Sequence, residues 1–334
     1  MRALAKDLAE TLALDDLPDV EALGVLVAIH WVRYQLLPEG LDQDDRHACL
    51  ECSAALLTVA PHLVPGPVRA QLTGGGTSAG GHAAEATARG IDLLGDYERT
   101  GKIHFLQAAV VSFQEAVDAT PPDHPNCPRR LSNLGAALRT RFERTEQQAD
   151  LDRAITLLSE AVEATPGDHS HRPGRLSNLG NALQTRFGRT GQLTDLDRAI
   201  TLLSEAVEAT PVGDPDLPVY LSNLGAALVT RFERTGRQAD LDHAITRLSE
   251  AVEATPGDHP HWPRHLSKLG ATLWTRFERT GRQPDLDRAI TLLSEAVEVT
   301  PGDHPERPGY LSNLGGALWT RFMGTGQQPD LDRA

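Results

Sequence analysis

Apolar residues recur through most of the chain in two alternating stripes, each with the spacing of an amphipathic helix. In the clearest copy, the first stripe consists of Leu131, Leu134, Leu138 and Phe142. The second stripe consists of Leu151, Ala154, Ile155, Leu158, Ala161 and Val162. Steps of mostly three and four residues place each set on one face of a helix. The pattern predicts one helix over residues 130–145 and a second from an N-cap at Asp150 to the Pro166-Gly167 pair.

The same pair of helices returns at a constant interval. The phrase Leu-Ser-Asn-Leu-Gly, with lysine for asparagine in one copy, begins at residues 131, 176, 221, 266 and 311, which are 45 residues apart. The phrase Leu-Asp-Arg-Ala-Ile, with histidine for arginine in one copy, begins at residues 151, 196, 241 and 286, and is cut short at 331. A constant period in the range of about 20–50 residues indicates a linear array of stacked units rather than one globular core. The glycine that closes the first phrase lies beside the apolar stripe, so we expect a neighbouring helix to approach it closely.

Composition divides the chain into three parts. Residues 1–72 carry helical spacing without a clean repeat, and residues 73–85 are rich in glycine, which predicts a flexible linker. The repeat array is predicted over residues 86–334, with a degenerate first copy that runs from Leu94-Gly95 to Pro121. The last copy stops in the first turn of its second helix, so we interpret it as truncated. Its uncovered first-helix stripe is an expected surface for self-association, because the ends of such arrays need a polar cap.

The overall charge narrows the range of partners. The formal net charge is −14, and binding to nucleic acid needs a basic face that neutralises phosphates. We therefore expect neither a nucleic acid nor an anionic membrane as a partner. The longest apolar run, residues 23–32, is interrupted by a histidine and is too short to span a bilayer. Three cysteines give no disulfide framework, so these features predict a cytoplasmic protein.

The repeated residues resemble the tetratricopeptide repeat (TPR). The TPR pattern places a large apolar residue, a Leu-Gly pair, an alanine and a closing proline at fixed positions in a helix pair. The matching residues in the clearest copy are Leu131, Leu134-Gly135, Leu138, Ala154, Leu158 and Pro166. The resemblance implies an all-α fold, a TPR-like right-handed superhelical solenoid of antiparallel helix pairs. The unit is longer than the usual ~34 residues, and the additional residues fall in the loops.

The two phrases are also similar to long actinobacterial and fungal repeat proteins that often end in a caspase-like CHAT peptidase domain. In such proteins the repeats are the sensing or regulatory part, and a downstream Cys/His pair performs the cleavage. No segment of this chain matches that peptidase domain.

In the TPR family the first helices line a concave groove that binds extended peptides, and the resemblance places a ladder of candidate residues there. The ladder consists of Asn133, Asn178, Asn223, Lys268 and Asn313. In the family this asparagine can bind a peptide backbone, and the alternative is that it pairs with a neighbouring helix. A clamp for a peptide carboxylate would also need a lysine where Ser132 and its equivalents stand.

A second groove position varies while its surroundings repeat, which suggests that it sets specificity. It carries, in order, Arg139, Gln184, Val229, Trp274 and Trp319. At the mouth of the groove, Arg130 and Arg175 of the earlier copies give way to Tyr220, His265 and Tyr310. Because aromatic residues and arginines are frequent binding anchors, we predict that the C-terminal half of the groove takes an apolar segment of a partner. The alternative is that the two tryptophans pack within the array.

Residues that could carry chemistry form no recognisable catalytic or metal-binding pattern. Cys49-x-x-Cys52 with His47 is half of a zinc site, and no second pair of ligands accompanies it. We therefore predict a non-catalytic protein-interaction scaffold without metal or cofactor, which binds a peptide or a protein. One alternative is the regulatory region of a larger CHAT-type peptidase. Another is RNA recognition by helical repeats, which the negative charge opposes.

Overall fold

The structure is a computed structural model that describes residues 20–36, 49, 52, 53, 56, 60–66, 68, 69 and 79–333. All regular secondary structure within these residues is helical. The chain forms two compact units, residues 1–161 and residues 162–334. The first unit contains α2 (Val20–Leu36), η1 (Pro61–Leu63), α5 (Ala79–Thr100), α6 (Ile103–Asp118), α7 (Cys127–Thr145) and most of α8 (Gln148–Glu163). The second contains α9 (Arg172–Thr190), α10 (Leu193–Glu208), α11 (Leu217–Thr235), α12 (Gln238–Glu253), α13 (Trp262–Thr280), α14 (Gln283–Glu298), α15 (Arg307–Thr325) and α16 (Gln328–Arg333).

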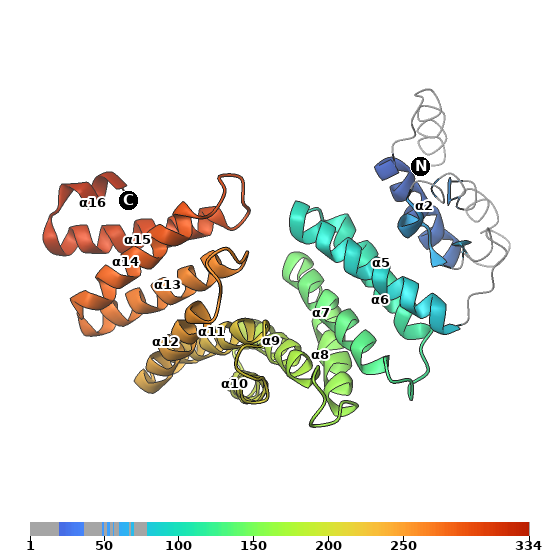
Figure 1. The fold of residues 1–334 in the computed structure, drawn as a ribbon, viewed down its shortest axis with the longest axis horizontal. Coiled ribbons are helices and arrows are strands. Elements are labelled where there is room, and N and C mark those ends of the chain that lie inside the picture. Colours follow the sequence, from blue (N-terminus) through green and yellow to red (C-terminus); the bar gives the residue numbers. More distant parts are fainter. Residues whose placement is uncertain are drawn as a thin grey trace. The chain divides into compact units, whose positions relative to one another are not determined.

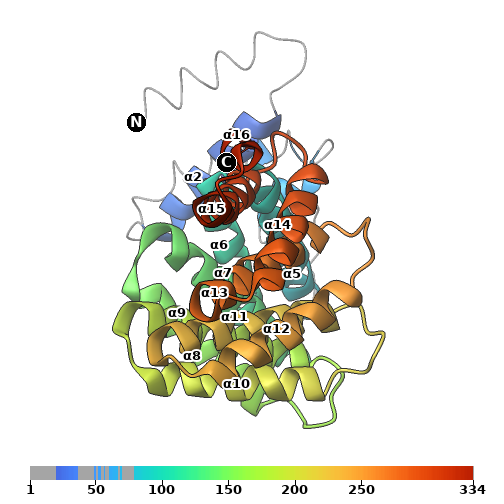
Figure 2. The same cartoon turned by 90° about the vertical axis from the view of Figure 1, so that its left-hand side faces the viewer.

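The array consists of helix pairs, as the apolar stripes predict. The first helices of the five clear copies begin at residues 127, 172, 217, 262 and 307, so the helices recur every 45 residues. In unit 2, α9 packs beside α10, α11 beside α12 and α13 beside α14, an arrangement that can be followed in Figures 1 and 2. The predicted all-α fold of consecutive helix pairs is confirmed.

Short left-handed turns join the two helices of each pair. Two residues connect them, and the first of these is Gly191, Gly236, Gly281 or Gly326, with φ between 66° and 71°. Glycine adopts this conformation without strain, and it closes a helix by allowing its N–H to reach a carbonyl of the last turn. In the first clear copy Glu146 takes the same place with φ of 55°. So short a connection reverses the chain and makes the two helices antiparallel.

Both helices of the first clear copy begin at other residues than predicted. The first helix begins at Cys127, earlier than predicted, with a proline in its first turn, where proline is well tolerated. The second helix begins at Gln148, so the predicted N-cap at Asp150 is wrong. Asp150 lies inside the first turn, is buried, and accepts hydrogen bonds from Arg141 Nε at 2.7 Å and Nη2 at 2.6 Å. The acidic residue therefore pairs with the preceding helix and does not cap its own.

Glycine brings the two helices of each pair together. A Cβ atom on Gly135, Gly180, Gly225 or Gly270 would lie 2.6–2.8 Å from the Cγ atom of a leucine on the second helix. The expected close approach is confirmed. In the degenerate first copy the predicted glycine, Gly95, is wrong, because no atom lies within 4 Å of the place where its Cβ would stand. Gly90, which is 45 residues before Gly135, packs under the ring of Phe113 instead, with 2.6 Å from a Cβ to Cδ1.

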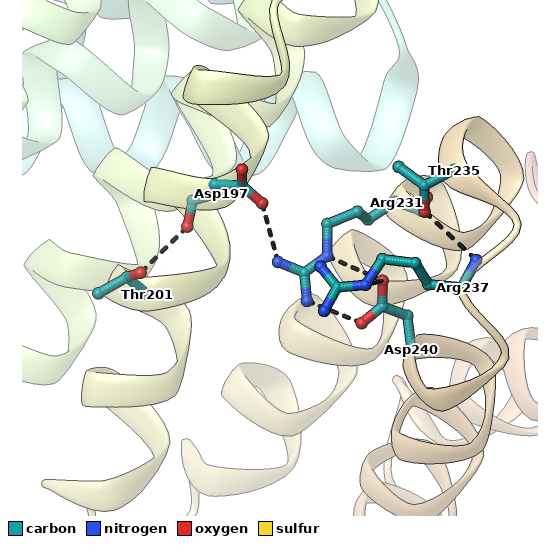
Figure 3. Close-up of polar contacts among 6 residues, drawn as sticks. All are labelled: Asp197, Thr201, Arg231, Thr235, Arg237 and Asp240. Carbon is teal, nitrogen blue, oxygen red and sulfur yellow. Dashed lines mark hydrogen bonds and ion pairs between the residues drawn. The ribbon is translucent and has the colours of Figure 1, made fainter.

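In unit 2, one arginine on each of α11, α13 and α15 joins its repeat to the one before it, and Figure 3 shows the first of these. Arg231 donates to both carboxylate oxygens of Asp240, at 2.9 and 2.7 Å, and its Nη1 donates to Asp197 of α10 at 2.8 Å. Arg276 and Arg321 repeat the arrangement one and two copies later. Each arginine thus holds a buried carboxylate of its own pair and an exposed one of the previous pair. Bidentate geometry of this kind is favourable for arginine and carboxylate.

In unit 1 a buried charged residue takes a place that leucine occupies in every clear copy. Arg89 stands 45 residues before Leu134, and its side chain is 8% exposed. It donates to Glu115, to Ser112 Oγ at 2.9 Å and to the carbonyl oxygen of Val64 at 3.3 Å. Trp31 Nε1 of α2 donates to the same Glu115 carboxylate at 3.0 Å. Residues before the array are therefore attached to α5 and α6 through one buried polar cluster.

The predicted division into residues 1–72, 73–85 and 86–334 stays a prediction. Much of the first two segments lies outside the described residues, and residues 79–85 form the first turns of α5. In the part of the N-terminal region that is described, α2 contributes to a small apolar core. This core contains Leu23, Val27, Cys49, Leu56, Ala60, Val64 and Val68.

Candidate functional site

The first helices of unit 2 form one face of the stack, which we call the first-helix face and which consists of α9, α11, α13 and α15. Along this face each first helix contacts the next one, whereas the second helices α10, α12 and α14 stand farther apart (Figure 1). Closer spacing on one side curves a stack toward that side. The first-helix face is therefore the inner side of unit 2, the side predicted to bind a partner.

Four members of the predicted ladder belong to this face, and those in α11, α13 and α15 each bond to the repeat before them. Asn223 Nδ2 donates to Ser177 Oγ at 3.1 Å, Lys268 Nζ to Ser222 Oγ at 3.0 Å, and Asn313 Nδ2 to Ser267 Oγ at 3.2 Å. All three side chains remain half-buried, as do those of Asn133 and Asn178 at the same position in α7 and α9. The pairing between neighbouring helices, the alternative considered above, is thus present. The role of these residues in binding a peptide stays a prediction.

The variable position contacts the following first helix. Gln184 Nε2 donates to Thr230 Oγ1 at 3.2 Å, and Trp274 Nε1 donates to Thr320 Oγ1 at 3.1 Å. Val229 packs beside the apolar core around α11 and α12. The indole of Trp274 also packs against Gly316 of α15. A Cβ atom added to this glycine would lie 2.4 Å from Cη2 of the indole. Trp274 therefore packs within the array, as the alternative to a groove position states.

The first and last residues of the variable series, Arg139 and Trp319, have other surroundings. Arg139 pairs with Glu143 on its own helix. Trp319 is 49% exposed, and its ring lies 5.7 Å from that of Phe322. A role of the five residues in partner specificity stays a prediction.

Most residues predicted at the mouth lie between helices. Arg130 and Arg175 are buried and donate to the hydroxyls of Thr120 and Thr165, which follow the preceding second helix. Tyr310 is buried and donates to Glu306 Oε2 at 2.7 Å. Tyr220 is half-buried, and burial raises its pKa to about 12. These side chains have structural contacts that sequence spacing alone did not indicate.

His265 occupies the same position in α13, and its side chain is buried without a hydrogen bond to any described residue. It is 3% exposed, and among the described residues neither of its ring nitrogens has a hydrogen-bond partner. Burial lowers its pKa to about 4, and the positive charges of Lys268, His261, Arg264 and His259 act in the same direction. The folded protein therefore holds this imidazole neutral.

A pH-dependent loss of stability follows from His265. The unfolded chain takes up the proton near pH 6.5 and the folded chain only near pH 4, so protonation favours the unfolded state between these values. The contribution of His265 is fully present above pH 6.5 and falls as the pH is lowered, by about 2–3 kcal/mol at pH 4.5. We expect His265→Tyr, which installs the residue of α11 and α15, to remove this part of the pH dependence. Urea unfolding of both proteins from pH 7.5 to 4.5 measures it, and parallel curves would contradict the prediction.

The candidate metal ligands near the N-terminus are part of the apolar core. Cys49 is 1% exposed, its thiol donates to the carbonyl oxygen of Val27 at 3.8 Å, and burial raises its pKa to about 11. Cys52 is half-buried, and His47 lies outside the described residues. Within the described part of the chain, no three His, Cys, Asp or Glu side chains are grouped so that they could hold a metal ion. None of the helices described here combines the length and the apolar character that crossing a membrane requires.

Comparison with known proteins relates the chain to solved helical-repeat structures. No family model and no curated protein sequence matches it. A putative kinesin light chain of Podosopora anserina with nearly identical TPR-like repeats is 18% identical, with a TM-score of 0.46 over 63% of this chain and 94% of that one. A thermophilic TPR protein of Thermus thermophilus is 19% identical, with a TM-score of 0.49 over 70% and 98% of the two chains. Yeast Tom70 is 15% identical, with a TM-score of 0.49 over 96% of this chain and 59% of Tom70.

Proposed function

We propose that the chain is a non-catalytic scaffold that binds an extended segment of a protein partner along the first-helix face of unit 2. The observation that supports this most directly is the ladder of Asn223, Lys268 and Asn313, which recurs at one spacing on successive helices. An extended peptide presents backbone N–H and C=O groups at regular intervals, so a row of polar side chains suits it. An asparagine that donates one N–H to a serine retains a second N–H and an acceptor oxygen.

The charge on α13 favours one chemical feature of the partner. Lys268 replaces the asparagine of the other copies. Arg264 lies one turn before it, is half exposed, and its Nε lies 3.5 Å from Glu306 Oε1. Burial lowers the pKa of Lys268 to about 8, so the amine is still mostly protonated at neutral pH. The Lys268 cation in an acidic chain favours an acidic residue in the part of the partner that crosses α13.

Site-specific photo-crosslinking tests the proposal. A photoreactive benzoylphenylalanine replaces Arg264 on the first-helix face or, as the matched control, Thr246, which is exposed on the second helix α12. In a lysate of the source organism, we expect one partner to be crosslinked from position 264 and not from position 246. Crosslinking of the same proteins from both positions would contradict a defined binding face.

A variant pair separates binding from stability. Asn223→Ala/Lys268→Ala should reduce the crosslinked partner at least about tenfold, the effect of losing roughly 1.4 kcal/mol of binding. Because both residues also bond to serines of neighbouring helices, the comparison is made at a temperature well below the thermal midpoint of both proteins. The control variant Thr246→Ala/Thr291→Ala changes two exposed residues of the second helices and should leave capture unchanged.

The second candidate function rests on the repeated phrases themselves. Leu-Ser-Asn-Leu-Gly and Leu-Asp-Arg-Ala-Ile are similar to the repeats that accompany CHAT-type peptidases, which favours a regulatory role toward such an enzyme. The same crosslinking experiment distinguishes the candidates, because a captured partner with a Cys/His peptidase domain would support regulation of proteolysis.

A further inference from the structure

The helices on either side of α13 each begin with a carboxylate and a tyrosine that bond to one another. In α11 and α15 the N-cap residue is acidic, Asp216 or Glu306, and the fourth residue of the helix is a tyrosine. Tyr310 donates to Glu306 Oε2 at 2.7 Å, and Tyr220 bonds to Asp216. A negatively charged acceptor therefore stands at the start of both helices, where it also complements the helix dipole.

In α13 the same two positions hold His261 and His265, so the carboxylate is replaced by a basic residue. The two rings lie edge to face with 6.5 Å between their centroids. A helical side chain covers the turn before it, so His265 lies toward the N-terminal end of α13. Its ring is 3% exposed, and both ring nitrogens lack a hydrogen-bond partner within the described part of the chain. The start of α13 thus combines a buried polar group that needs a partner with a helix end that favours an anion.

The surroundings of this imidazole are positively charged. The groups whose positive charge acts on His265 are Lys268, His261, Arg264 and His259. From α15, the carboxylate of Glu306 faces the cluster, but it lies 3.5 Å from Arg264 Nε and accepts the hydroxyl of Tyr310. A buried polar group without a partner requires an explanation, and a bound ion is one of the few. Among these cations the ion that fits is an anion.

We propose that the start of α13 binds a phosphate group between His261 and His265. The imidazole of His265 donates an N–H to a phosphate oxygen, and the backbone N–H groups of the first turn add the positive end of the helix dipole. Arg264 contributes from the solvent side, because its guanidinium has five N–H donors and Glu306 lies beside only one of them. His261 is exposed, so its ring can turn aside and admit the anion to His265.

A phosphate suits this arrangement better than a carboxylate does. Its three or four oxygens accept hydrogen bonds from several directions, whereas a carboxylate presents two oxygens in one plane. The donors proposed here come from the loop before α13, from its backbone and from two of its side chains. The site is independent of partner binding on the first-helix face, so either proposal can fail without the other.

Nuclear magnetic resonance of the histidine rings in the full chain tests the proposal. Inorganic phosphate is titrated at pH 6.5 while sodium chloride is lowered to hold the ionic strength constant. The ring signals of His265 are identified by their absence from the His265→Tyr variant. We expect them to move toward the protonated form and to saturate, because a bound anion offsets the cations that keep this ring neutral.

A second titration with O-phosphoserine identifies the source of the phosphate. Binding of both ligands would assign the site to a phosphate ester on a side chain as well as to the free ion. Binding of inorganic phosphate alone would assign it to the free ion. If neither ligand moves the His265 signals, or if they drift without saturation as those of the exposed His169 do, the proposal is wrong.

The chain supplies a matched control variant. His261→Asp/His265→Tyr installs the pair of α11, Asp216 and Tyr220, and so places a carboxylate where the phosphate is proposed to bind. At ten times the dissociation constant, phosphate should raise the thermal midpoint of the unchanged chain about 3–6 °C more than that of this variant. The comparison cancels the general stabilising effect of phosphate on folded proteins. An equal rise in both proteins would overturn the proposal.

A single variant keeps the test decisive if the double variant does not fold. Arg264→Val installs the residue that α11 carries at this position, Val219. It should weaken phosphate binding about fivefold or more, because a charge-assisted hydrogen bond is lost while His265 is unchanged. An unchanged dissociation constant would show that the phosphate does not bind at the start of α13.

Discussion

Glu115→Ala should destabilise unit 1 more than any other single change that we predict, by about 3–5 kcal/mol. The substitution leaves Arg89 buried without its carboxylate partner, and the side chains of Arg89 and Glu115 are only 8% and 12% exposed. Burial already lowers the pKa of the Arg89 guanidinium, an effect that Glu115 opposes. The same change removes the acceptor of Trp31 Nε1. Urea unfolding followed by hydrogen exchange of α5 and α6 measures the loss.

The chain itself supplies the matched control for this prediction. Leucine occupies the position of Arg89 in all five following copies, so Arg89→Leu/Glu115→Ala replaces the ion pair with the apolar contact of the repeat. Replacing both partners of a buried pair is often neutral, whereas removing one is not. We therefore expect the double variant to recover most of the stability. An equal loss in both variants would show that the uncompensated charge is not the cause.

Gly225→Ala should destabilise unit 2 by about 3 kcal/mol, at the upper end of what overpacking a core produces. A Cβ atom at this position would lie 2.6 Å from Cγ and 2.9 Å from Cδ2 of Leu248, and 3.4 Å from the backbone oxygen of Ala244. The leucine is 1% exposed and has no room to move away. Helix propensity alone predicts the opposite sign, a gain of about 1 kcal/mol for alanine over glycine. The midpoint of urea unfolding, followed by circular dichroism, decides between the two.

Gly95→Ala is the control for Gly225→Ala. Gly95 also lies inside a helix, but it is exposed and no atom lies within 4 Å of the place of its Cβ. We expect this variant to be stabilised by up to about 1 kcal/mol, since only the helix propensity changes. A gain in stability for Gly225→Ala similar to that of Gly95→Ala would mean that the helices can separate to admit the methyl group.

The two predictions concern residues that differ in how well the sequence alone could identify them. Gly225 could be recognised from the sequence, because it recurs every 45 residues beside the apolar stripe and lies on the face that another helix must cover. Arg89 was not recognised, because it breaks the apolar pattern at a position where five copies have leucine. Its burial depends on residues of α2 and on Val64, which are far from it in the sequence. The signal that could have revealed it was the strict period itself, since counting back from Gly135 gives Gly90 and thus places Arg89 in the core.

The candidate site likewise combines positions that the sequence predicted with contacts that only the structure shows. The sequence placed Asn223, Lys268 and Asn313 at equivalent positions of successive helices, and the structure brings them together on one face. The sequence did not indicate that each of these three residues bonds to a serine 46 residues earlier. Nor did it indicate that Arg231 connects carboxylates 34 residues before it and 9 residues after it.

By itself, the sequence determined the helices, their pairing and the period of the array. Those features depend on neighbours three or four residues apart and on turns of two residues, which the order of amino acids specifies directly. The tertiary structure decided which side chains lie between repeats, because contacts over 34 or 46 residues depend on how the helices stack. Trp274 and Trp319 occupy the same position of the repeat, yet one is covered and the other is exposed, because α15 packs on α13 and no described helix packs in the same way on α15.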